Sequence, residues 1–286
     1  MNQDKSISIV MPYYNQPEIL RFTLPVWRKV FPHEEIIIVD DGSEKKASDV
    51  VKLLNLSATV IYQKRNGYGT ARALNLGYRL THSDRILFTN CDIVPNFTYA
   101  DCSKLSPNII RCFIRSECKH IDVPEILTKN NPDITFRKCF MPDIRFQMGA
   151  ISDTTEKYIV PILPIYCYGF GLSVPKYMVD GVGGFCENVN FWGGEDILLC
   201  LQIEDKFPEA IFEIDTRHPV LHLETKDRLT KRSIIKSYQR FFPPIAKKYL
   251  SPHIFSKYEI DRLEKPKAKK NLSSDLNTVM VYNKKI

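Results

Sequence analysis

The sequence predicts an α/β fold with a mostly parallel sheet that is covered by helices on both faces. Its first hundred residues alternate between short, β-rich apolar runs and stretches with the spacing of amphipathic helices. Each apolar run ends in turn residues or polar residues, as strands of such sheets do. The chain has 286 residues, of which 44% are hydrophobic and 26% charged, and these values suit a globular protein with a sizeable core.

Strands and helices are expected in regular alternation up to residue 95. The first helix has apolar residues at helical spacing and is expected to kink at Pro25. The strands are expected at residues 6–12, 35–41, 58–63 and 85–95, and the helices at residues 17–30, 45–55 and 69–80.

The second half of the chain is less regular. A strand is expected at residues 108–117, a helix near 175–180, a second helix after Glu195 and a strand at 210–216. Beyond residue 226 the pattern predicts basic amphipathic helices that are interrupted by Pro243, Pro244 and Pro252.

Charge is distributed unevenly along the chain. Residues 1–215 carry a net charge of −4, and residues 216–286 carry a net charge of +11. The first residues lack the basic flank and apolar core of a signal peptide, and prolines and glycines interrupt the most apolar stretch, at 158–175. The eight cysteines include no CxxC pair. We therefore expect a cytoplasmic protein with reduced, mostly buried thiols.

Polar and aromatic residues follow the expected strands, at the edge where an open α/β sheet binds its ligands. Aromatic rings suit a flat base, amide and acidic groups suit an imide and a ribose, and a carboxylate suits the cation of a diphosphate. The sequence therefore favours a nucleotide site, toward which either Tyr13 or Tyr14 would turn. The residues after the four strands are Pro12, Tyr13, Tyr14 and Asn15, then Asp40, Asp41, Gly42 and Ser43, then Arg65, Asn66 and Gly67, and then Asn90, Cys91 and Asp92.

Six stretches, in this order, resemble family-2 glycosyltransferases of the GT-A fold. ISIVMPYYNQ, IIIVDDGS, NGYGTARALNLGY and ILFTNCDIVP resemble the nucleotide-binding half of that family. The segment at 168–196, which ends in NFWGGED, and HLETKD at 222–227 resemble the C-terminal half of β-1,4-galactosyltransferases and chondroitin polymerase-like enzymes. The resemblance implies a GT-A domain at 1–225, with a nucleotide-binding half at 1–96 and an acceptor and catalytic half at 97–225. A basic helical extension follows at 226–286.

The resemblance implies a donor site that holds a divalent cation, Mn²⁺ or Mg²⁺. Asp41 matches the acid that holds uracil, and Asp92 matches the last acid of the DxD motif, which binds the cation on the donor diphosphate. Asn90 stands where the first acid would be, and this departure removes one charge. His222 matches the histidine that completes the metal site. The implied nucleotide-sugar site comprises Pro12, Tyr13, Tyr14, Asn15, Asp41, Asn66, Arg72, Asn90 and Asp92.

The resemblance also implies an acceptor site with a catalytic base. Trp192, Glu195 and Asp196 match the WGGED segment, whose final acid serves as the base. A single base opposite the departing UDP implies an inverting glycosyltransferase that forms a β-linkage. The implied donor is a UDP-hexose or UDP-N-acetylhexosamine, with galactose or N-acetylgalactosamine favoured, and the implied acceptor is a glycan or a lipid-linked glycan. Ile197 stands where the relatives carry further acids, so no acceptor specificity is implied.

Structural roles remain open for the same residues, because capping, turn formation and core packing use the same residue types. The alternatives are Glu195 and Asp196 as helix caps, Asp92 and Asp40 as turn acids, Trp192 as a core residue, Arg72 as a solvated side chain, and His218 or His120 in place of His222.

The basic region beyond residue 226 also has more than one interpretation. It predicts either a solvated helix that packs on the core or attachment to anionic lipid at the inner face of a membrane. Nucleic-acid binding is a third alternative and is not expected. For the whole chain, the alternatives are a retaining N-acetylgalactosaminyltransferase-like enzyme, against which Asp196 argues, and an inactive nucleotide-sugar-binding protein, which Asn90 keeps open.

Overall fold

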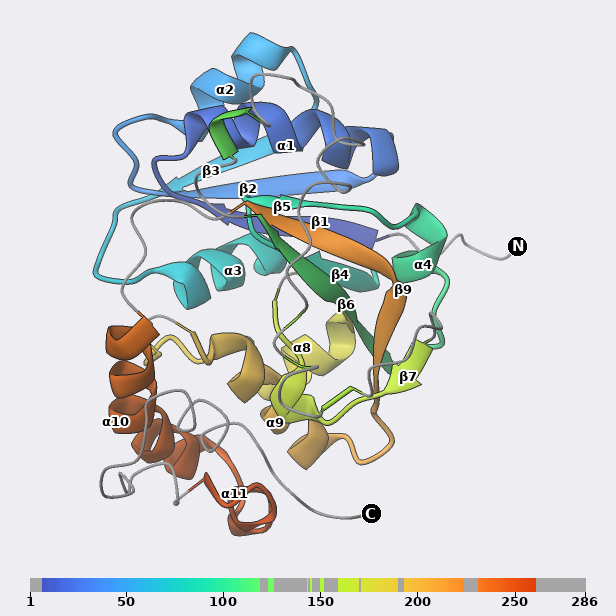
Figure 1. Ribbon diagram of the computed structural model, residues 1–286, viewed down its shortest axis with the longest axis vertical. Helices are drawn as coiled ribbons and strands as arrows, with labels where there is room; N and C mark the ends of the chain where they lie inside the picture. The colour runs from blue at the N-terminus through green and yellow to red at the C-terminus, as the bar shows by residue number, and fades with distance from the viewer. Residues whose placement is uncertain are drawn as a thin grey trace.

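The computed structural model describes residues 7–118, 123–125, 143, 145, 150–151, 159–169, 171–189, 193–223 and 231–260. Its centre is a mixed nine-stranded sheet with the order β3-β2-β1-β4-β8-β6-β9-β5, in which β7 pairs with β9 (Figure 1). The strands are β1 (Ile7–Tyr13), β2 (Glu35–Asp41), β3 (Thr59–Gln63), β4 (Arg85–Phe88), β5 (Ile93–Val94), β6 (Ile109–Cys118), β7 (Ile159–Pro161), β8 (Leu172–Pro175) and β9 (Ile211–Leu223).

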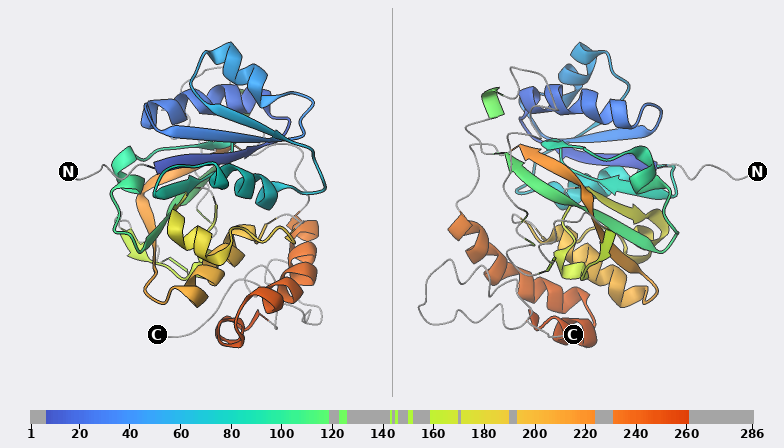
Figure 2. Two further views of the ribbon diagram at one scale, coloured as in Figure 1. Left: turned by 180° about the vertical axis from the view of Figure 1, so that it is seen from behind. Right: turned by 45° about the vertical axis from the view of Figure 1, so that its right-hand side comes forward.

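Helices cover both faces of the sheet, as expected from the sequence. α1 and α2 lie on one face, and α3, α8 and α9 lie on the other, with α10 and α11 beyond α9 (Figures 1 and 2). The helices are α1 (Pro17–Val30), α2 (Ala47–Leu54), α3 (Thr70–Arg79), α4 (Tyr99–Ser103), the 3₁₀ turn η1 (Pro164–Tyr166), α8 (Lys176–Val182), α9 (Glu195–Lys206), α10 (Lys231–Tyr249) and α11 (Pro252–Lys257).

The alternation of side chains along β1 accounts for the two helical layers. Ile9 and Met11 are fully buried in the cluster that contains Trp27 of α1. Val10, between them, points to the opposite face and packs with Leu74 of α3. Because successive strand residues point to opposite faces, a strand that is apolar on both sides must be covered on both.

Strand direction brings the predicted site segments to one edge of the sheet. β1 is parallel to β2 and to β4, so their carboxyl ends lie together. β8 is antiparallel to β4, with Leu172 opposite Phe88, so the residues just before β8 reach the same edge. β6 is antiparallel to β8 and parallel to β9, which places the end of β9 there as well.

One expected strand, at 85–95, is in fact two. β4 ends at Phe88, and a turn closed by a hydrogen bond from the Ile93 amide to the Asn90 carbonyl (3.2 Å) leads into β5. β5 pairs with β9 in the antiparallel sense, with Ile93 opposite His222. The apolar residues on both sides of the turn conceal this break in the sequence.

The interruption expected at Pro243 and Pro244 is wrong, because α10 runs through both prolines. Phe242 and Ala246, on either side of them, are fully buried in the core, together with Leu250. Burial of an apolar helix face stabilises a helix more than a few backbone hydrogen bonds do, so packing offsets the missing N–H groups. The expected break at Pro252 is confirmed: α10 ends at Tyr249, and Pro252 is the first residue of α11.

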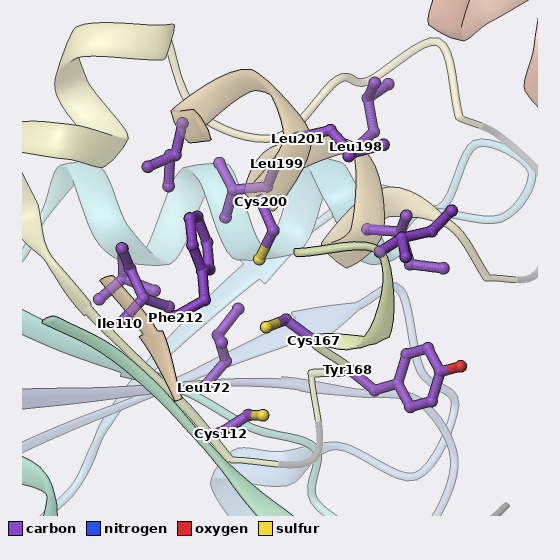
Figure 3. Packing of buried hydrophobic residues seen from close by; sticks show 14 of the residues in the cluster. Ile110, Cys112, Cys167, Tyr168, Leu172, Leu198, Leu199, Cys200, Leu201 and Phe212 are labelled. Atoms are coloured by element: carbon purple, nitrogen blue, oxygen red, sulfur yellow. The ribbon is translucent and has the colours of Figure 1, made fainter. Parts of the chain in front are cut away.

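Seven cysteines lie in the described part of the chain, and all are free and buried. Cys112, Cys167 and Cys200 lie in the core beneath α9 (Figure 3), in keeping with the expected burial of the thiols. Among the described residues, no helix combines the length and the apolarity needed to cross a bilayer.

Candidate active site

The carboxylate of Asp41, at the end of β2, is the centre of a polar cluster. It accepts hydrogen bonds from Gln63 Nε2 (2.7 Å), Arg65 (3.1 Å) and Arg72 (3.4 Å). Gln63 lies directly beside Asp41 in the register of β2 and β3, and Arg72 lies in the first turn of α3. Only 6% of the Asp41 side chain is exposed, whereas about a third of each arginine side chain is exposed. Asp41 is therefore a buried hydrogen-bond acceptor, and the two guanidinium groups that bind it are partly exposed to solvent.

Asp40 has the turn-forming role expected from the sequence. Its two carboxylate oxygens accept hydrogen bonds from the amides of Ser43 (2.8 Å) and Ala47 (2.9 Å), which begin the turn into α2. Asp40 is 1% exposed.

The two neighbouring tyrosines have different positions. The Tyr13 side chain is 1% exposed, and its hydroxyl donates to the Lys45 carbonyl (2.6 Å). The Tyr14 side chain is 42% exposed, and the Arg65 guanidinium lies 3.4 Å from the centre of its ring. Of the two, only Tyr14 offers a ring surface beside Asp41.

Of the other residues predicted to bind the donor, Asn15 and Arg72 form hydrogen bonds with neighbouring loops. Asn15 holds two turns together, since its amide donates to Ser43 Oγ (3.0 Å) and its Oδ1 accepts from the Lys45 amide (3.1 Å). Arg72 donates to the Lys64 carbonyl (2.6 Å) as well as to Asp41. Pro12 lies within β1 beside Val39, Asn66 is exposed, and Asn90 is partly buried in the turn after β4.

Asp92 and His222, which the family resemblance implies as metal ligands, lie side by side. Asp92 Oδ2 lies 3.3 Å from His222 Nε2, and the Leu223 amide donates to the Asp92 carbonyl (2.9 Å). Two ligands at neighbouring positions around an octahedral cation are about 3 Å apart when each metal–ligand bond is about 2.1 Å. Carboxylate and imidazole are both common metal ligands, so this pair fits two positions of a divalent cation.

A second group with metal-ligand chemistry exists elsewhere. Ligand atoms of Asp101, Asp215 and His218 lie within 4.8 Å of one another. Arg217 already pairs with both acids, at 2.5 Å from Asp215 and 3.2 Å from Asp101. This cation of the protein offsets one of the two negative charges, so the group is better described as a charge network between α4 and the middle of β9. His120, the other alternative ligand, lies outside the described residues.

Glu195 and Asp196 begin α9, immediately after two glycines in left-handed conformations, Gly193 (φ 82°) and Gly194 (φ 98°). A side chain at either position would strain this turn. Gly194 is the N-cap, and no side chain caps the helix. Asp196 instead accepts hydrogen bonds from the amides of Gly169 (2.6 Å) and Ile197 (2.8 Å), which hold its carboxylate at the positive end of the helix.

Burial perturbs both acids. Burial, and to a lesser extent the neighbouring Asp196, raises the pKa of Glu195 to about 8. Burial also raises the pKa of Asp196, against the two peptide N–H groups, which lower it. At neutral pH Glu195 therefore keeps its proton.

Glu195→Gln is expected to stabilise the protein above about pH 5. The pKa of Glu195 is higher in the folded state than in the unfolded state, so the unfolded state loses its proton first as the pH rises from about 4.5 to 8, which favours unfolding. Glutamine removes this effect. Thermal unfolding from pH 4 to 9 should show equal Tm values at the acidic end and a Tm about 5–10 °C higher for the variant near pH 8. Parallel pH curves for the two proteins would contradict a protonated Glu195.

Sequence reasoning placed Arg65 at the expected nucleotide edge without including it in the implied donor site, and it missed Gln63. The signal for both was available, because Gln63 ends the strand beside Asp41 and Arg65 follows that strand at the same edge of the sheet. Trp192, predicted to contact the acceptor, lies outside the described residues.

Comparison with known proteins shows similarity to glycosyltransferases. Residues 8–100 match the family model "Glycosyl transferase family 2". A chondroitin synthase of Pasteurella multocida (strain Pm70) is 27% identical over 220 residues, which cover 69% of this chain and 23% of that protein. The chain thus spans about a quarter of the length of this relative.

Solved structures resemble the whole fold. The mannosyltransferase PcManGT from Pyrobaculum calidifontis, in complex with GDP-Man and Mn²⁺, has a TM-score of 0.60 at 14% identity and covers 92% of this chain and 70% of its own. S. aureus TarS 1–349 in complex with UDP has a TM-score of 0.58 at 13% identity, covering 89% and 69%. The chain therefore has the fold of GT-A glycosyltransferases, and its residues 8–100 match the model of glycosyl transferase family 2.

Proposed function

We propose that the protein is an inverting, metal-dependent glycosyltransferase of polysaccharide or glycan biosynthesis. It transfers a hexose or N-acetylhexosamine, with galactose or N-acetylgalactosamine favoured, from a UDP-sugar to a hydroxyl of a glycan acceptor. The observation that carries this proposal is the arrangement at one sheet edge of the Asp41 cluster, the Asp92–His222 pair and the Asp196 carboxylate. These groups suit a nucleobase, a diphosphate-bound cation and an acceptor hydroxyl.

The hydrogen-bonding pattern around Asp41 favours uracil. A carboxylate offers about four lone-pair positions, and three are occupied by Gln63, Arg65 and Arg72. The remaining position accepts one N–H, and the flanking N–H groups face outward as donors. The imide edge of uracil presents one N–H between two carbonyl oxygens. Guanine presents two adjacent N–H groups, and the corresponding ring nitrogen of cytosine carries no proton, so each leaves a buried group unpaired.

Calorimetric titration with UDP, CDP and GDP tests this assignment. We expect UDP to bind at least about tenfold more tightly than CDP or GDP, because one buried polar group left without a partner costs about 1–3 kcal/mol. The pyrophosphate is the same in all three, so it serves as an internal control for binding through the cation. Equal affinities would show that Asp41 does not select the base, and absence of binding by all three would overturn the proposed donor.

Asp196 is the proposed base. Its raised pKa makes it a stronger base than an exposed carboxylate, and the two peptide N–H groups orient it. The protonated Glu195 can donate a hydrogen bond to the acceptor sugar. With Asp196 taking the acceptor proton, the acceptor oxygen attacks the anomeric carbon from the side opposite the UDP, which inverts the configuration and forms a β-linkage from an α-linked donor.

Asp92 and His222 would hold the divalent cation, which, when bound, would neutralise charge on the departing diphosphate. Asn90 cannot add a negative charge there, so Asp92 would be the single acid of this motif. Mn²⁺ is favoured over Mg²⁺, because imidazole suits transition metals better than Mg²⁺.

Stereochemistry separates this proposal from the retaining alternative. A β-linked product from an α-linked donor, shown by the anomeric proton coupling in its NMR spectrum, supports inversion. An α-linked product would favour the retaining N-acetylgalactosaminyltransferase-like enzyme. UDP binding without transfer to any acceptor would favour an inactive nucleotide-sugar-binding protein.

We also propose that α10 attaches the protein to an anionic membrane surface, where a lipid-linked acceptor would lie. One face of α10 is exposed and carries Arg240, Phe241, Pro244, Lys247 and Lys248. The opposite face packs in the core. Three cations around a 42% exposed phenylalanine suit the headgroup region of a bilayer.

The double variant Lys247→Glu/Lys248→Glu is expected to bind vesicles that contain phosphatidylglycerol at least about 30-fold more weakly, since each basic residue contributes about 1 kcal/mol. Co-sedimentation measures this. The control variant Lys45→Glu/Lys46→Glu makes the same charge change at two exposed lysines before α2. Equal losses in both variants would indicate a general charge effect rather than a surface on α10.

A further inference from the structure

A buried asparagine, Asn75, joins helix α3 to the segment between α8 and α9, which leads to the proposed base Asp196. Asn75, in α3, is 1% exposed. Its Nδ2 donates to the Phe185 carbonyl (2.9 Å) and to Glu187 Oε1 (2.8 Å), and its Oδ1 accepts from the Phe185 amide (2.8 Å). The amide thus pairs with both backbone groups of one residue that lies 110 positions further along the chain.

The two ends of this connection belong to different parts of the site. Arg72, one helical turn before Asn75, binds Asp41 at the proposed nucleobase site. Phe185 lies between α8 and α9, on the segment that continues to Asp196. Asn75 therefore holds the backbone of Phe185 against α3.

The segment around Gly184 and Phe185 is closely packed against α3 and β4. Gly184 has φ 86°, and a Cβ there would lie 2.5 Å from Asn75 Oδ1 and 2.8 Å from the ring of Tyr78. The Phe185 ring meets Phe88 edge-on, with the ring centres 4.8 Å apart. Further along the same segment, the side-chain amide of Asn188 donates to the Tyr249 hydroxyl of α10. The asparagine pairing supplies the polar, directional part of this attachment.

We propose that Asn75 is a positioning residue, which holds the segment before α9 so that Asp196 lies at the correct distance from the donor bound at Asp41. The inference rests on the proposed glycosyl transfer. Misplacement of a reacting group by about 1 Å can lower a rate about 100-fold without any direct contact with the substrate. Asn75 would thus affect the rate of transfer and leave binding of the nucleotide nearly unchanged.

Asn75→Leu keeps the size of the side chain and removes all three hydrogen bonds. With saturating donor and acceptor, kcat should fall about 10- to 100-fold, while the Kd for UDP should change less than about threefold, since Asp41, Arg65 and Arg72 remain. In hydrogen exchange without any ligand, the amides of residues 183–189 should exchange at least about tenfold faster. Asn75→Asp should act similarly, because it places a second carboxylate beside Glu187.

A charge exchange separates positioning from folding. Glu187→Gln alone should have little effect, since its Oε1 still accepts from Asn75. Combined with Asn75→Asp, it supplies an N–H donor to the new carboxylate and should recover part of the lost kcat.

A wild-type kcat in Asn75→Leu at a temperature well below its Tm would overturn the inference, even if the Tm were lower, because that pattern belongs to a purely structural residue. Unchanged hydrogen exchange at 183–189 would also overturn it. Failure of the proposed function would instead appear in the unsubstituted protein, as absence of UDP binding or of transfer.

Discussion

Asp196→Asn should slow transfer by about 10²- to 10⁴-fold, the usual contribution of a general base. Asparagine has the shape of aspartate, but its amide cannot take the proton of the acceptor hydroxyl. The affinity for UDP should change less than about threefold, because Asp196 is hydrogen-bonded to the amides of Gly169 and Ile197, whereas the proposed nucleobase site is built by other groups around Asp41. Product formation at saturating UDP-galactose, together with calorimetry for UDP, measures both quantities.

Asp205→Asn is the matched control. Asp205 lies in the same helix, and its carboxylate accepts a hydrogen bond from the Ser251 amide (2.6 Å) at the far end. The substitution removes the same charge and should preserve the rate. A large loss of UDP affinity in Asp196→Asn would assign this residue to the structure of the site, and a preserved rate would require a different base.

Asp92→Ala and His222→Ala should weaken UDP binding in the presence of Mn²⁺ and leave it unchanged in the presence of a chelator. Substitution of a residue that merely supports a metal ligand costs about 10- to 100-fold in metal affinity, so loss of a ligand should cost at least that much. The double variant should be little worse than either single variant, because both side chains act on one ion. Calorimetry at several Mn²⁺ concentrations measures the effect.

His218→Ala distinguishes the two candidate groups. His218 belongs to the charge network of Asp101 and Asp215, and its removal should not alter the metal dependence of UDP binding. If His218→Ala abolished that dependence and His222→Ala preserved it, the cation would have to be assigned to the network. Equal losses with and without metal in Asp92→Ala would show that Asp92 supports the fold rather than an ion.

The local pattern of apolar residues was sufficient to predict helices that bury a single apolar face. The predicted helix at 17–30 coincides with α1, whose apolar positions at helical spacing, Ile19, Leu20, Leu24 and Trp27, are all buried. The pattern misled where tertiary packing decides the outcome. α10 continues through two prolines because Phe242 and Ala246 are buried, and β5 separates from β4 because its partner is β9, more than a hundred residues away.

For the site, the order of motifs in the sequence indicated where the site residues would lie, but it indicated their hydrogen-bond partners less well. That Asp92 and His222 meet could be expected from the family resemblance, and the register of β5 and β9 accounts for it. The cluster on Asp41 could not be assembled in the same way, since it depends on the register of β2 with β3 and on the rotamers of two arginines. The different roles of Tyr13 and Tyr14 also depend on backbone geometry, because a strand end can turn either side chain outward.

The order of strands in the sheet means that the family 2 region is not a separable folding unit. β4 is paired with β1 on one side, but its other partner is β8, and β5 is paired with β9. Residues 8–100 alone would leave one edge of β4 and the whole of β5 as unpaired, apolar edges, which are sites of edge-to-edge aggregation. Residues 8–100 therefore depend on strands that follow them in the chain, and the sheet is complete only when β9 lies between β6 and β5.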